Sequence, residues 1–522
     1  MLFIRTILNR KSPSVPSLIQ RLLTLPSNKG ISVTSQSSLT GISSIGAVVF
    51  PSKDSLSLRL ERLQHGDSVV SAFQSWMGNG SPIHRGDIFH AINRLRKLKM
   101  NKRALEVMEW VIRERPYKPK ELEYSYLLEF SVKIHGISCG ETLFTHIPNE
   151  FQNELLYNNL VIACLDKGVV RLSLAYMKRM RELSFPISPY VYNRLIILHC
   201  SPKRRKYIPK ILTQMRADRV ARHTSTCNIL LKIEADDHNI DGLMKVFSDM
   251  KRFNVDPNEI TYGILATAHA AARLYAASEA FVEAIENSKT EKNWSTLDIL
   301  IIMYGYLGKE KELERTWEIV QGLPYVRSKS FILAIEAFGR MGRIDKSEQL
   351  WKGMMSTRDL NQTCQFNSII SVYCRSGLLD KASELFSEME AKCCTPNSIT
   401  YRHLALGCLK SGLVNEGLKT LELGKDEPVS FQVRRSIPWL ETTYSIIEVL
   451  ADVGELESVK KLFREFEVTN YCRYGFVYNT LLRAHLKAKV NNPNLLENMI
   501  LSGCRPDAES YSLIRLINQL DF

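Results

Sequence analysis

The stretch FNSIISVYCRSGLLDKASELFSEMEAKCCTPNSITY, residues 366–401, ends much as it begins. An aromatic residue followed by a polar one opens it, and Thr400-Tyr401 opens a similar stretch 35 residues later. Equivalent positions recur at Tyr124, Tyr157, Tyr192, Cys227, Tyr262, Leu297, Phe331, Phe366, Tyr401, Tyr444, Tyr478 and Tyr511. Six of the eleven steps between them are 35 residues long, and one step is 43. A fixed period of this length indicates tandem structural repeats.

Each repeat is predicted to form two helices. The first helix of the quoted unit has an apolar stripe made of Phe366, Ile369, Ile370 and Tyr373. The second has the helical spacing i, i+3, i+4, i+7 in Ala382, Leu385, Phe386 and Met389. A hinge glycine, which tolerates the left-handed conformation at a helix end, recurs at Gly168, Gly308, Gly342, Gly377 and Gly412. Because one such hairpin cannot cover both apolar faces, the sequence predicts an all-α, right-handed superhelical α-solenoid of about twelve helix-turn-helix repeats.

Four regions are predicted along the chain. Residues 1–50 are expected to be an organellar transit peptide, disordered and cleaved, and residues 51–84 to hold an N-terminal cap helix. Residues 508–522 are expected to form a C-terminal capping helix. The predicted repeats are 85–120, 121–153, 154–188, 189–223, 224–258, 259–293, 294–327, 328–362, 363–397, 398–440, 441–474 and 475–507. The 43-residue step carries extra residues near GKDEPVSFQVRRSIPW (424–439), which are expected to form a longer surface loop.

Charge and composition single out the N-terminal segment. Residues 1–53 contain six basic residues and precede the first acidic one, Asp54, and ten serines lie in the first 50 residues. This basic, Ser-rich and amphipathic composition is typical of a transit peptide, so a mitochondrial location is predicted, with the chloroplast as the alternative. The rest of the chain has 63 basic against 55 acidic residues, a mild excess that only weakly favours a nucleic-acid partner. No run of 18 or more apolar residues occurs, so no membrane span is expected.

No set of residues predicts catalysis. The eleven cysteines contain no C-x-x-C pair, so a disulfide framework and a zinc site are both unexpected. The zinc-deaminase signature, the H-E-x-x-H motif and the Walker phosphate loop are all missing from the sequence. We therefore expect no enzyme activity, no metal and no cofactor.

The repeats carry a family resemblance. The 35-residue period, the aromatic-Asn start and endings such as VDPN (255–258) resemble the pentatricopeptide repeat family, as do LSGCRPD (501–507) and AFGRMGRIDKSEQLW (337–351). About four-fifths of the chain is covered by this resemblance. The uniform spacing is similar to the purely repetitive P class, which is plant and organellar. The tetratricopeptide repeat, with 34 residues and a peptide-binding groove, is the alternative.

The resemblance implies that single-stranded RNA is read at about one base per repeat by two or three side chains. The residue after the aromatic and the last residue of the repeat would contact the base edge, because an amide offers a donor and an acceptor together. The implied base-reading pairs are Ser125 with Asn153, Asn158 with Ser188, Asn193 with His223, Asn228 with Asn258, Asn367 with Asn397, and Asn479 with Asp507. By the resemblance, the last pair prefers uracil.

Other repeats depart from that pattern. The departing pairs are Asp298 with Arg327, Ile332 with Gln362, Arg402 with Leu440, and Ser445 with Tyr474, and Gly263 with Asn293 matches only in part. The first repeat departs as well. We therefore expect about five or six bases to be read, in broken groups.

A basic row lies near the end of the first helices. Its members occupy one equivalent position and are Lys97, Lys133, Arg340, Arg375, Lys410 and Lys487, while Asp166 and Asp236 interrupt it. Stacked repeats would align these cations into a stripe that meets RNA phosphates. A basic residue at a helix C-terminus also complements the helix dipole, and that simpler explanation stays open for each residue. A helix-start preference of asparagine likewise explains any single Asn.

Three functions fit these observations. The first is a sequence-selective organellar RNA-binding protein, acting in RNA processing, stability or translation by occupancy. The second is a structural component of the mitochondrial ribosome that contacts ribosomal RNA and ribosomal proteins. The third, favoured least, is a peptide-binding adaptor.

Overall fold

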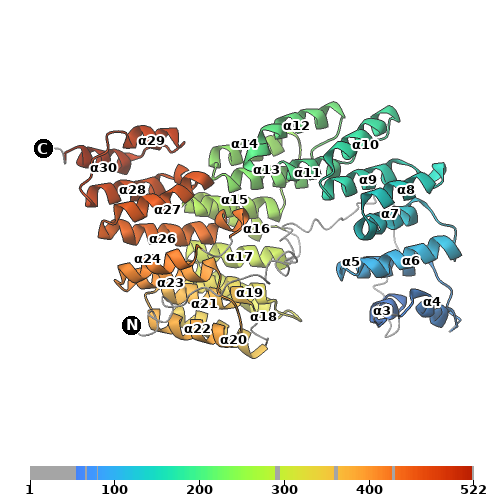
Figure 1. Ribbon diagram of the computed structural model, residues 1–522, viewed down its shortest axis with the longest axis horizontal. Coiled ribbons are helices and arrows are strands. Elements are labelled where there is room, and N and C mark those ends of the chain that lie inside the picture. Colours follow the sequence, from blue (N-terminus) through green and yellow to red (C-terminus); the bar gives the residue numbers. More distant parts are fainter. Residues whose placement is uncertain are drawn as a thin grey trace. The chain divides into compact units, whose positions relative to one another are not determined.

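The computed structural model describes residues 55–64, 67–78, 80–288, 294–357, 362–425 and 429–519. The predicted leader, residues 1–50, lies outside the described residues. All regular elements in the described part are helices (Figure 1), which confirms the all-α prediction. The chain divides into two compact units after Ile229. We call the described residues up to Ile229 the N-terminal unit and those from Leu230 onward the C-terminal unit.

The N-terminal unit consists of consecutive α-helices with short 3₁₀ turns between some of them. The α-helices are α3 (Leu56–Arg62), α4 (Val69–Gly78), α5 (Arg85–Lys97), α6 (Asn101–Glu114), α7 (Glu121–His135), α8 (Ile137–His146), α9 (Glu154–Asp166), α10 (Val170–Glu182), α11 (Pro189–Leu198) and α12 (Ile208–Ala217). The 3₁₀ turns are η1 (Asn149–Phe151) and η2 (Pro202–Tyr207). Helix α13 (Thr224–Asp236) begins in this unit and ends in the next.

The C-terminal unit continues the same alternation. Its helices are α14 (Ile240–Arg252), α15 (Glu259–Ala271), α16 (Tyr275–Glu286), α17 (Trp294–Leu307), α18 (Glu310–Gln321), α19 (Ser328–Arg340), α20 (Ile344–Thr357), α21 (Thr363–Arg375), α22 (Leu379–Ala391), α23 (Ser398–Lys410), α24 (Val414–Leu423), α25 (Phe431–Arg434), α26 (Ile437–Val453), α27 (Leu456–Thr469), η3 (Tyr471–Arg473), α28 (Gly475–Lys487), α29 (Leu495–Leu501) and α30 (Ala508–Asn518). In the regular repeats a first helix packs against its own partner and against the next first helix, as α21 does with α22 and α23.

The hairpin geometry follows from a few residues in each repeat. Asn397 caps α23 by accepting hydrogen bonds from the backbone N–H groups of Ile399 and Thr400, which satisfies donors that a helix start leaves unpaired. At the other end, the five hinge glycines adopt φ angles between 68° and 78°, a conformation that costs other residues steric energy. The chain therefore reverses at the same point in each of these repeats.

The start of the described chain differs from the prediction. One cap helix was expected within residues 51–84, but the structure has two, α3 and α4. Between them the backbone N–H of Gln64 donates to the carboxylate of Asp67, and the Ser68 hydroxyl accepts from the N–H of Val70. These local hydrogen bonds compete with a continuous helix, so the chain stops and starts again.

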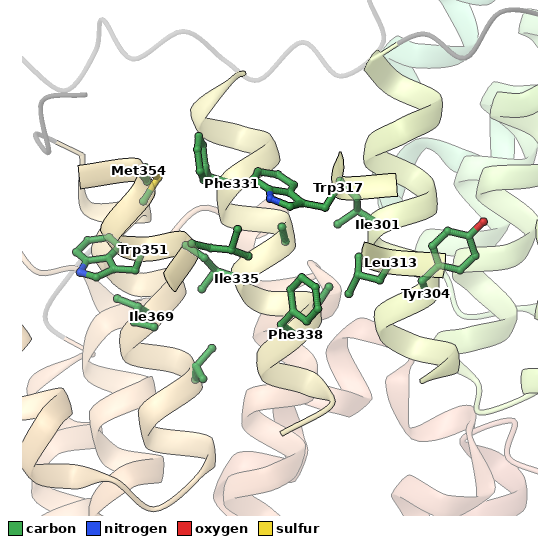
Figure 2. Close-up of a cluster of buried hydrophobic side chains, with 14 of the residues drawn as sticks. Ile301, Tyr304, Leu313, Trp317, Phe331, Ile335, Phe338, Trp351, Met354 and Ile369 are labelled. Atoms are coloured by element: carbon green, nitrogen blue, oxygen red, sulfur yellow. The ribbon is translucent and has the colours of Figure 1, made fainter. Parts of the chain in front are cut away.

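The core of the C-terminal unit runs between the helix pairs. Figure 2 shows aromatic and aliphatic side chains from successive repeats meeting in one layer. The Trp317 and Phe331 rings lie edge to face with centroids 5.1 Å apart, and Trp351 and Phe366 repeat this contact at 5.4 Å. Because second helices such as α18 and α20 place an aromatic residue against the first helix of the next repeat, these repeats cover one another's apolar surface.

The 43-residue step gives the longer connection that was expected, because residues 424–436 separate α24 from α26 where residues 392–397 separate α22 from α23. Its later residues form α25 and the start of α26, which has 17 residues where α23 and α28 have 13. Pro438 lies in the first turn of α26, with Ser436 as the preceding cap residue, a position where proline has no helical hydrogen bond to lose. The Arg435 side chain is only 8% exposed. The surface loop is therefore only part of the outcome, because some of the extra residues lengthen α26, which packs against the unit itself.

Candidate nucleic-acid interface

The predicted base-reading positions lie where neighbouring first helices meet. The first member of each pair lies early in a first helix, and the second member in most cases caps the next first helix. Asn153, Ser188, Asn258, Asn397 and Asp507 are the N-cap residues of α9, α11, α15, α23 and α30. These predicted base-reading positions are therefore helix-capping positions in the structure.

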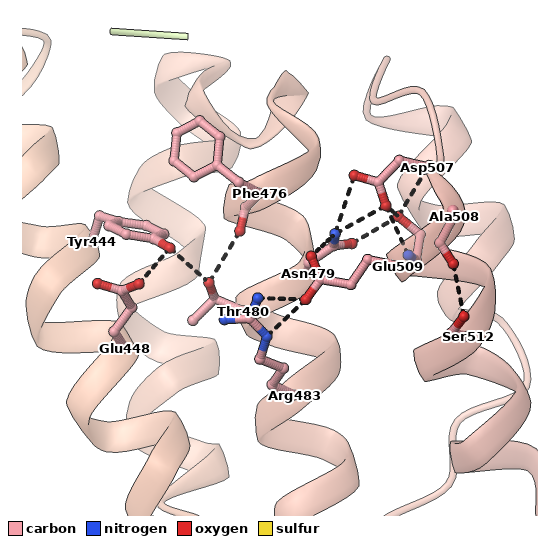
Figure 3. Close-up of polar contacts among 11 residues, drawn as sticks. Tyr444, Glu448, Phe476, Asn479, Thr480, Arg483, Asp507, Ala508, Glu509 and Ser512 are labelled. Atoms are coloured by element: carbon pink, nitrogen blue, oxygen red, sulfur yellow. Dashed lines mark hydrogen bonds and ion pairs between the residues drawn. The ribbon is translucent and has the colours of Figure 1, made fainter. Parts of the chain in front are cut away.

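The pair Asn479 and Asp507 is in direct contact (Figure 3). The Asn479 Nδ2 donates to both carboxylate oxygens of Asp507, at 3.1 and 3.3 Å, and to Glu509 at 3.0 Å. The Ser510 hydroxyl donates to Asn479 Oδ1 at 2.7 Å. Although partial burial opposes it, hydrogen bonds from the Ser510 N–H and from Asn479 lower the pKa of Asp507. The carboxylate is therefore held ionised as an acceptor beside a fixed amide.

The pair Asn367 and Asn397 is joined in a similar way. The Asn367 Nδ2 donates to Asn397 Oδ1 at 3.3 Å, and the Thr400 hydroxyl donates to Asn367 Oδ1 at 2.8 Å. Asn397 Oδ1 also accepts from the N–H of Thr400 at 3.1 Å. A base that contacts this pair would exchange hydrogen bonds with groups that are already oriented.

The N-terminal unit brings two further pairs close together. The backbone N–H of Ser188 donates to Asn158 Oδ1 at 2.8 Å. Asn193 Nδ2 donates to the Ser225 hydroxyl at 3.0 Å, and that hydroxyl lies 3.1 Å from His223 Nδ1. Asn193 Oδ1 is buried and has no hydrogen-bond partner among the described residues. A buried acceptor without a donor is costly, so this amide has an unused capacity to bind.

In the two remaining predicted pairs, no direct contact joins the two partners among the hydrogen bonds described below. Ser125 receives a hydrogen bond from Asn159 Nδ2, while Asn153 caps α9. Asn228 lies in the N-terminal unit and Asn258 in the C-terminal unit, where it accepts from the N–H of Thr261 at 3.0 Å. The amides of Asn193, Asn228, Asn367 and Asn479 are only 0–7% exposed. Base contact at these four positions therefore requires the neighbouring side chains to give way.

Two of the departing pairs have a structural role. Asp298 is buried and pairs with Arg327 at 3.0 Å, and it also accepts from the Ser330 hydroxyl at 2.8 Å. Arg402 is buried against the Trp439 ring, 3.8 Å from its centroid, and pairs with Glu465 at 3.0 Å. These positions satisfy their own charges within the chain.

The basic row divides into exposed and internally paired members. Lys97 and Lys487 are exposed at the ends of their helices. Lys133 is exposed and pairs with Glu129 at 2.6 Å, and Lys410 donates to the carbonyl of Arg375 at 2.6 Å. Only the exposed ammonium groups can meet a phosphate without rearrangement.

The two arginines of the row lie in a crowded polar cluster of the C-terminal unit. Arg340 pairs with Glu441 at 2.7 Å and stacks on the Tyr306 ring at 3.9 Å. Burial and the charge of Arg340 lower the pKa of Arg375, and burial raises the pKa of Glu336 despite both arginines. Glu441 was not among the predicted site residues. The irregular 43-residue step was the signal that could have drawn attention to it.

The fold and the paired polar positions define a helical-repeat protein with one polar site between successive first helices. The model of the PPR repeat family matches residues 222–271 and 362–410, and the PPR repeat model matches residues 330–357. A mitochondrial pentatricopeptide repeat-containing protein of Arabidopsis thaliana is 60% identical over 464 residues, covering 89% of this chain and 87% of that protein. The chain belongs to the pentatricopeptide repeat family.

More distant relatives agree with this assignment. A second mitochondrial pentatricopeptide repeat-containing protein of Arabidopsis thaliana is 25% identical over 424 residues, covering 81% of this chain and 70% of that protein. The mitochondrial location predicted from the leader is confirmed by these relatives. The crystal structure of the pentatricopeptide repeat protein PPR10 in complex with an 18-nt psaJ RNA element is 16% identical, with a TM-score of 0.36, covering 86% of this chain and 70% of that one. Within the described residues, no helix is long and apolar enough to cross a membrane.

Proposed function

We propose that this chain binds single-stranded mitochondrial RNA and acts in RNA processing, stability or translation by occupying its binding site. The observation that carries the proposal is the direct contact between polar partners on successive first helices, seen at Asn479 with Asp507 and at Asn367 with Asn397. Each pair holds an amide and an acceptor in one place, which suits the donor and acceptor edge of a base once the neighbouring side chains give way. Membership of the family supports the same conclusion through the base-reading role that the sequence resemblance implies.

The test is an RNA-binding measurement on three alanine variants. Asn228→Ala, Asn367→Ala and Asn479→Ala each remove one amide, and each is expected to weaken RNA binding by ~1–3 kcal/mol. Asn498→Ala is the matched control, because Asn498 is exposed on α29, outside the first helices. Gel shifts with a pool of random single-stranded RNA measure affinity, and far-UV circular dichroism checks that the variants fold. Equal affinity of all three folded variants and the control would contradict the proposal.

A second candidate is a structural component of the mitochondrial ribosome. The observation that favours it is the broken series of base-reading pairs, in which Asp298 and Arg402 satisfy their charges internally. Such a protein would contact folded RNA or protein through surfaces other than the base-reading row. Sedimentation of mitochondrial lysate separates the candidates, since the ribosomal component must move with ribosomal particles after nuclease treatment. Migration as a free protein would exclude that role.

A further inference from the structure

Five residues of the C-terminal unit occupy the position of the predicted basic row in their repeats, and we call these five the inner row. The row continues the predicted basic stripe through repeats with other residue types, and its members are Asp236, Tyr306, Arg340, Arg375 and Lys410. They lie at or near the C-terminal ends of α13, α17, α19, α21 and α23. If RNA is bound by this unit, the phosphates are expected along this row.

Residues 435–441, which we call the crossing segment, contact three members of that row. The Glu441 carboxylate accepts from Arg340 Nη2 at 2.7 Å and from the Tyr306 hydroxyl at 2.8 Å. At the other end of the segment, Arg435 Nη2 donates to the Asp236 carbonyl at 2.6 Å and pairs with Asp237 at 2.6 Å. The crossing segment therefore contacts residues that lie a hundred or more positions earlier in the chain.

The crossing segment is anchored by an aromatic residue. The Trp439 ring covers the Arg402 guanidinium at 3.8 Å, and Trp439 Nε1 donates to Glu465 at 3.1 Å. Both the Arg435 side chain and Trp439 are nearly buried. A segment held at its two ends and its middle has one defined position in the folded unit.

A second set of contacts joins early and late repeats of the C-terminal unit. His238 and Arg273 occupy hinge positions where other repeats have glycine, and their φ angles are 52° and 59°. A left-handed conformation costs such residues roughly 1–2 kcal/mol each. Their side chains pack on the later helices, with Arg273 4.1 Å from the Phe476 ring centroid and His238 5.0 Å from that of Tyr471. The strained hinges therefore place side chains where they hold the early repeats against the late ones.

We propose that the crossing segment is an internal competitor of RNA, in which the Glu441 carboxylate occupies Arg340 in place of an RNA phosphate. This proposal rests on the proposed function, since it describes how the binding of RNA to this unit is regulated. Carboxylate and phosphate bind a guanidinium through the same kind of charge-assisted hydrogen bond. RNA that engages the inner row must displace the segment, so its apparent association constant is the intrinsic one multiplied by the fraction of molecules in which the segment is displaced.

The first variant removes the competing charge and keeps the shape. Glu441→Gln is expected to raise the affinity for a fluorescent oligouridine of about 30 nucleotides, longer than one base per repeat requires. The expected gain is about three- to tenfold. Glu457→Gln is the matched control, because it removes one negative charge from an exposed residue on α27, 87% exposed. The control is expected to bind like the wild type.

Three further measurements separate this effect from a general change in stability. Arg435→Gln releases the other end of the crossing segment and is expected to raise affinity in the same direction. Arg340→Gln removes the shared cation, so Glu441→Gln added to it is expected to give no further gain. Hydrogen exchange in the wild type is expected to become faster within residues 435–441 when the oligouridine is added. Circular dichroism identifies any variant that does not fold.

The outcomes distinguish the two proposals. If the wild type binds RNA but folded Glu441→Gln and Arg435→Gln bind no better than Glu457→Gln, the competitor role is overturned and the proposed function stands. Slower exchange in residues 435–441 on addition of RNA would overturn the competitor role as well. If neither the wild type nor any variant binds RNA, the proposed function fails and the competitor role fails with it.

Discussion

Asn479 illustrates how one side chain serves two purposes at the residue scale. Its amide links α28 to the N-terminus of α30 through Asp507 and Ser510 (Figure 3), and the same amide is the one predicted to meet a base. Asp298 occupies the equivalent position in another repeat and is fully engaged with Arg327. The identity of the residue at this position therefore decides whether two repeats are joined there by amide hydrogen bonds or by an ion pair.

His403 gives a prediction for the dependence of stability on pH. Burial, followed by the charges of Arg375 and Arg402, lowers the pKa of His403 from 6.5 to about 3 in the folded chain. The unfolded chain therefore binds a proton at this residue more readily than the folded chain does. The contribution of neutral His403 to the free energy of unfolding is complete above pH 6.5 and is lost as the pH falls toward 3. His403 contributes at most about 1.4 kcal/mol per pH unit to the slope of the free energy of unfolding against pH.

The measurement is urea unfolding of the wild type and of His403→Gln at pH 7.5 and pH 5.5. The variant is expected to lose less free energy of unfolding over this interval than the wild type, because glutamine does not titrate. A wild type and a variant with the same change in free energy would show that His403 is not buried in its neutral form.

At the element scale, the hinge between two helices depends on backbone conformation. Gly377 separates α21 from α22 with a φ of 74°, and a Cβ placed there meets no atom within 4 Å. Gly377→Ala is therefore expected to destabilise the protein by about 1–2 kcal/mol through backbone strain alone. Chemical denaturation measures the change.

Gly353 provides a control, because alanine there is expected to change stability in the opposite direction. It lies inside α20 at an ordinary helical φ, and a Cβ there meets only Phe331, at 3.7 Å. Gly353→Ala is expected to stabilise the protein by roughly 0.5–1 kcal/mol, because alanine favours a helix. If both substitutions changed stability in the same direction, the left-handed hinge would not be the reason for glycine at residue 377.

At the scale of the whole molecule, RNA affinity is expected to depend on salt. Lys97 and Lys133 are exposed members of the basic row in the N-terminal unit. Each phosphate contact contributes about 0.7 to the slope of log affinity against log salt for single strands. The double variant Lys97→Ala/Lys133→Ala is therefore expected to reduce the slope by about 1.4.

A titration of RNA binding at several salt concentrations measures that slope. The control is Lys102→Ala/Lys178→Ala, which removes two exposed lysines from the second helices α6 and α10 of the same unit. If the control reduced the slope as much as the row variant, the net charge of the unit and not the row would govern binding.

The repeat pattern was readable in the sequence because it depends on local physics. The apolar spacing, the hinge glycines and the capping residues each act within a few residues of chain. They determined the all-α class, the pairing of helices and the positions at which successive first helices exchange polar contacts. The family followed from the same motifs.

Only the tertiary structure decided which of those positions are already occupied. Glu441 and Arg340 are about a hundred residues apart, and Arg435 and Asp237 nearly two hundred, so no local pattern links them. A 43-residue step looks the same in sequence whether its extra residues form a loop or lengthen a helix. Its packing against Arg402 and the inner row depends on how the repeats curve, and that curvature is the sum of many small rotations between neighbouring helices.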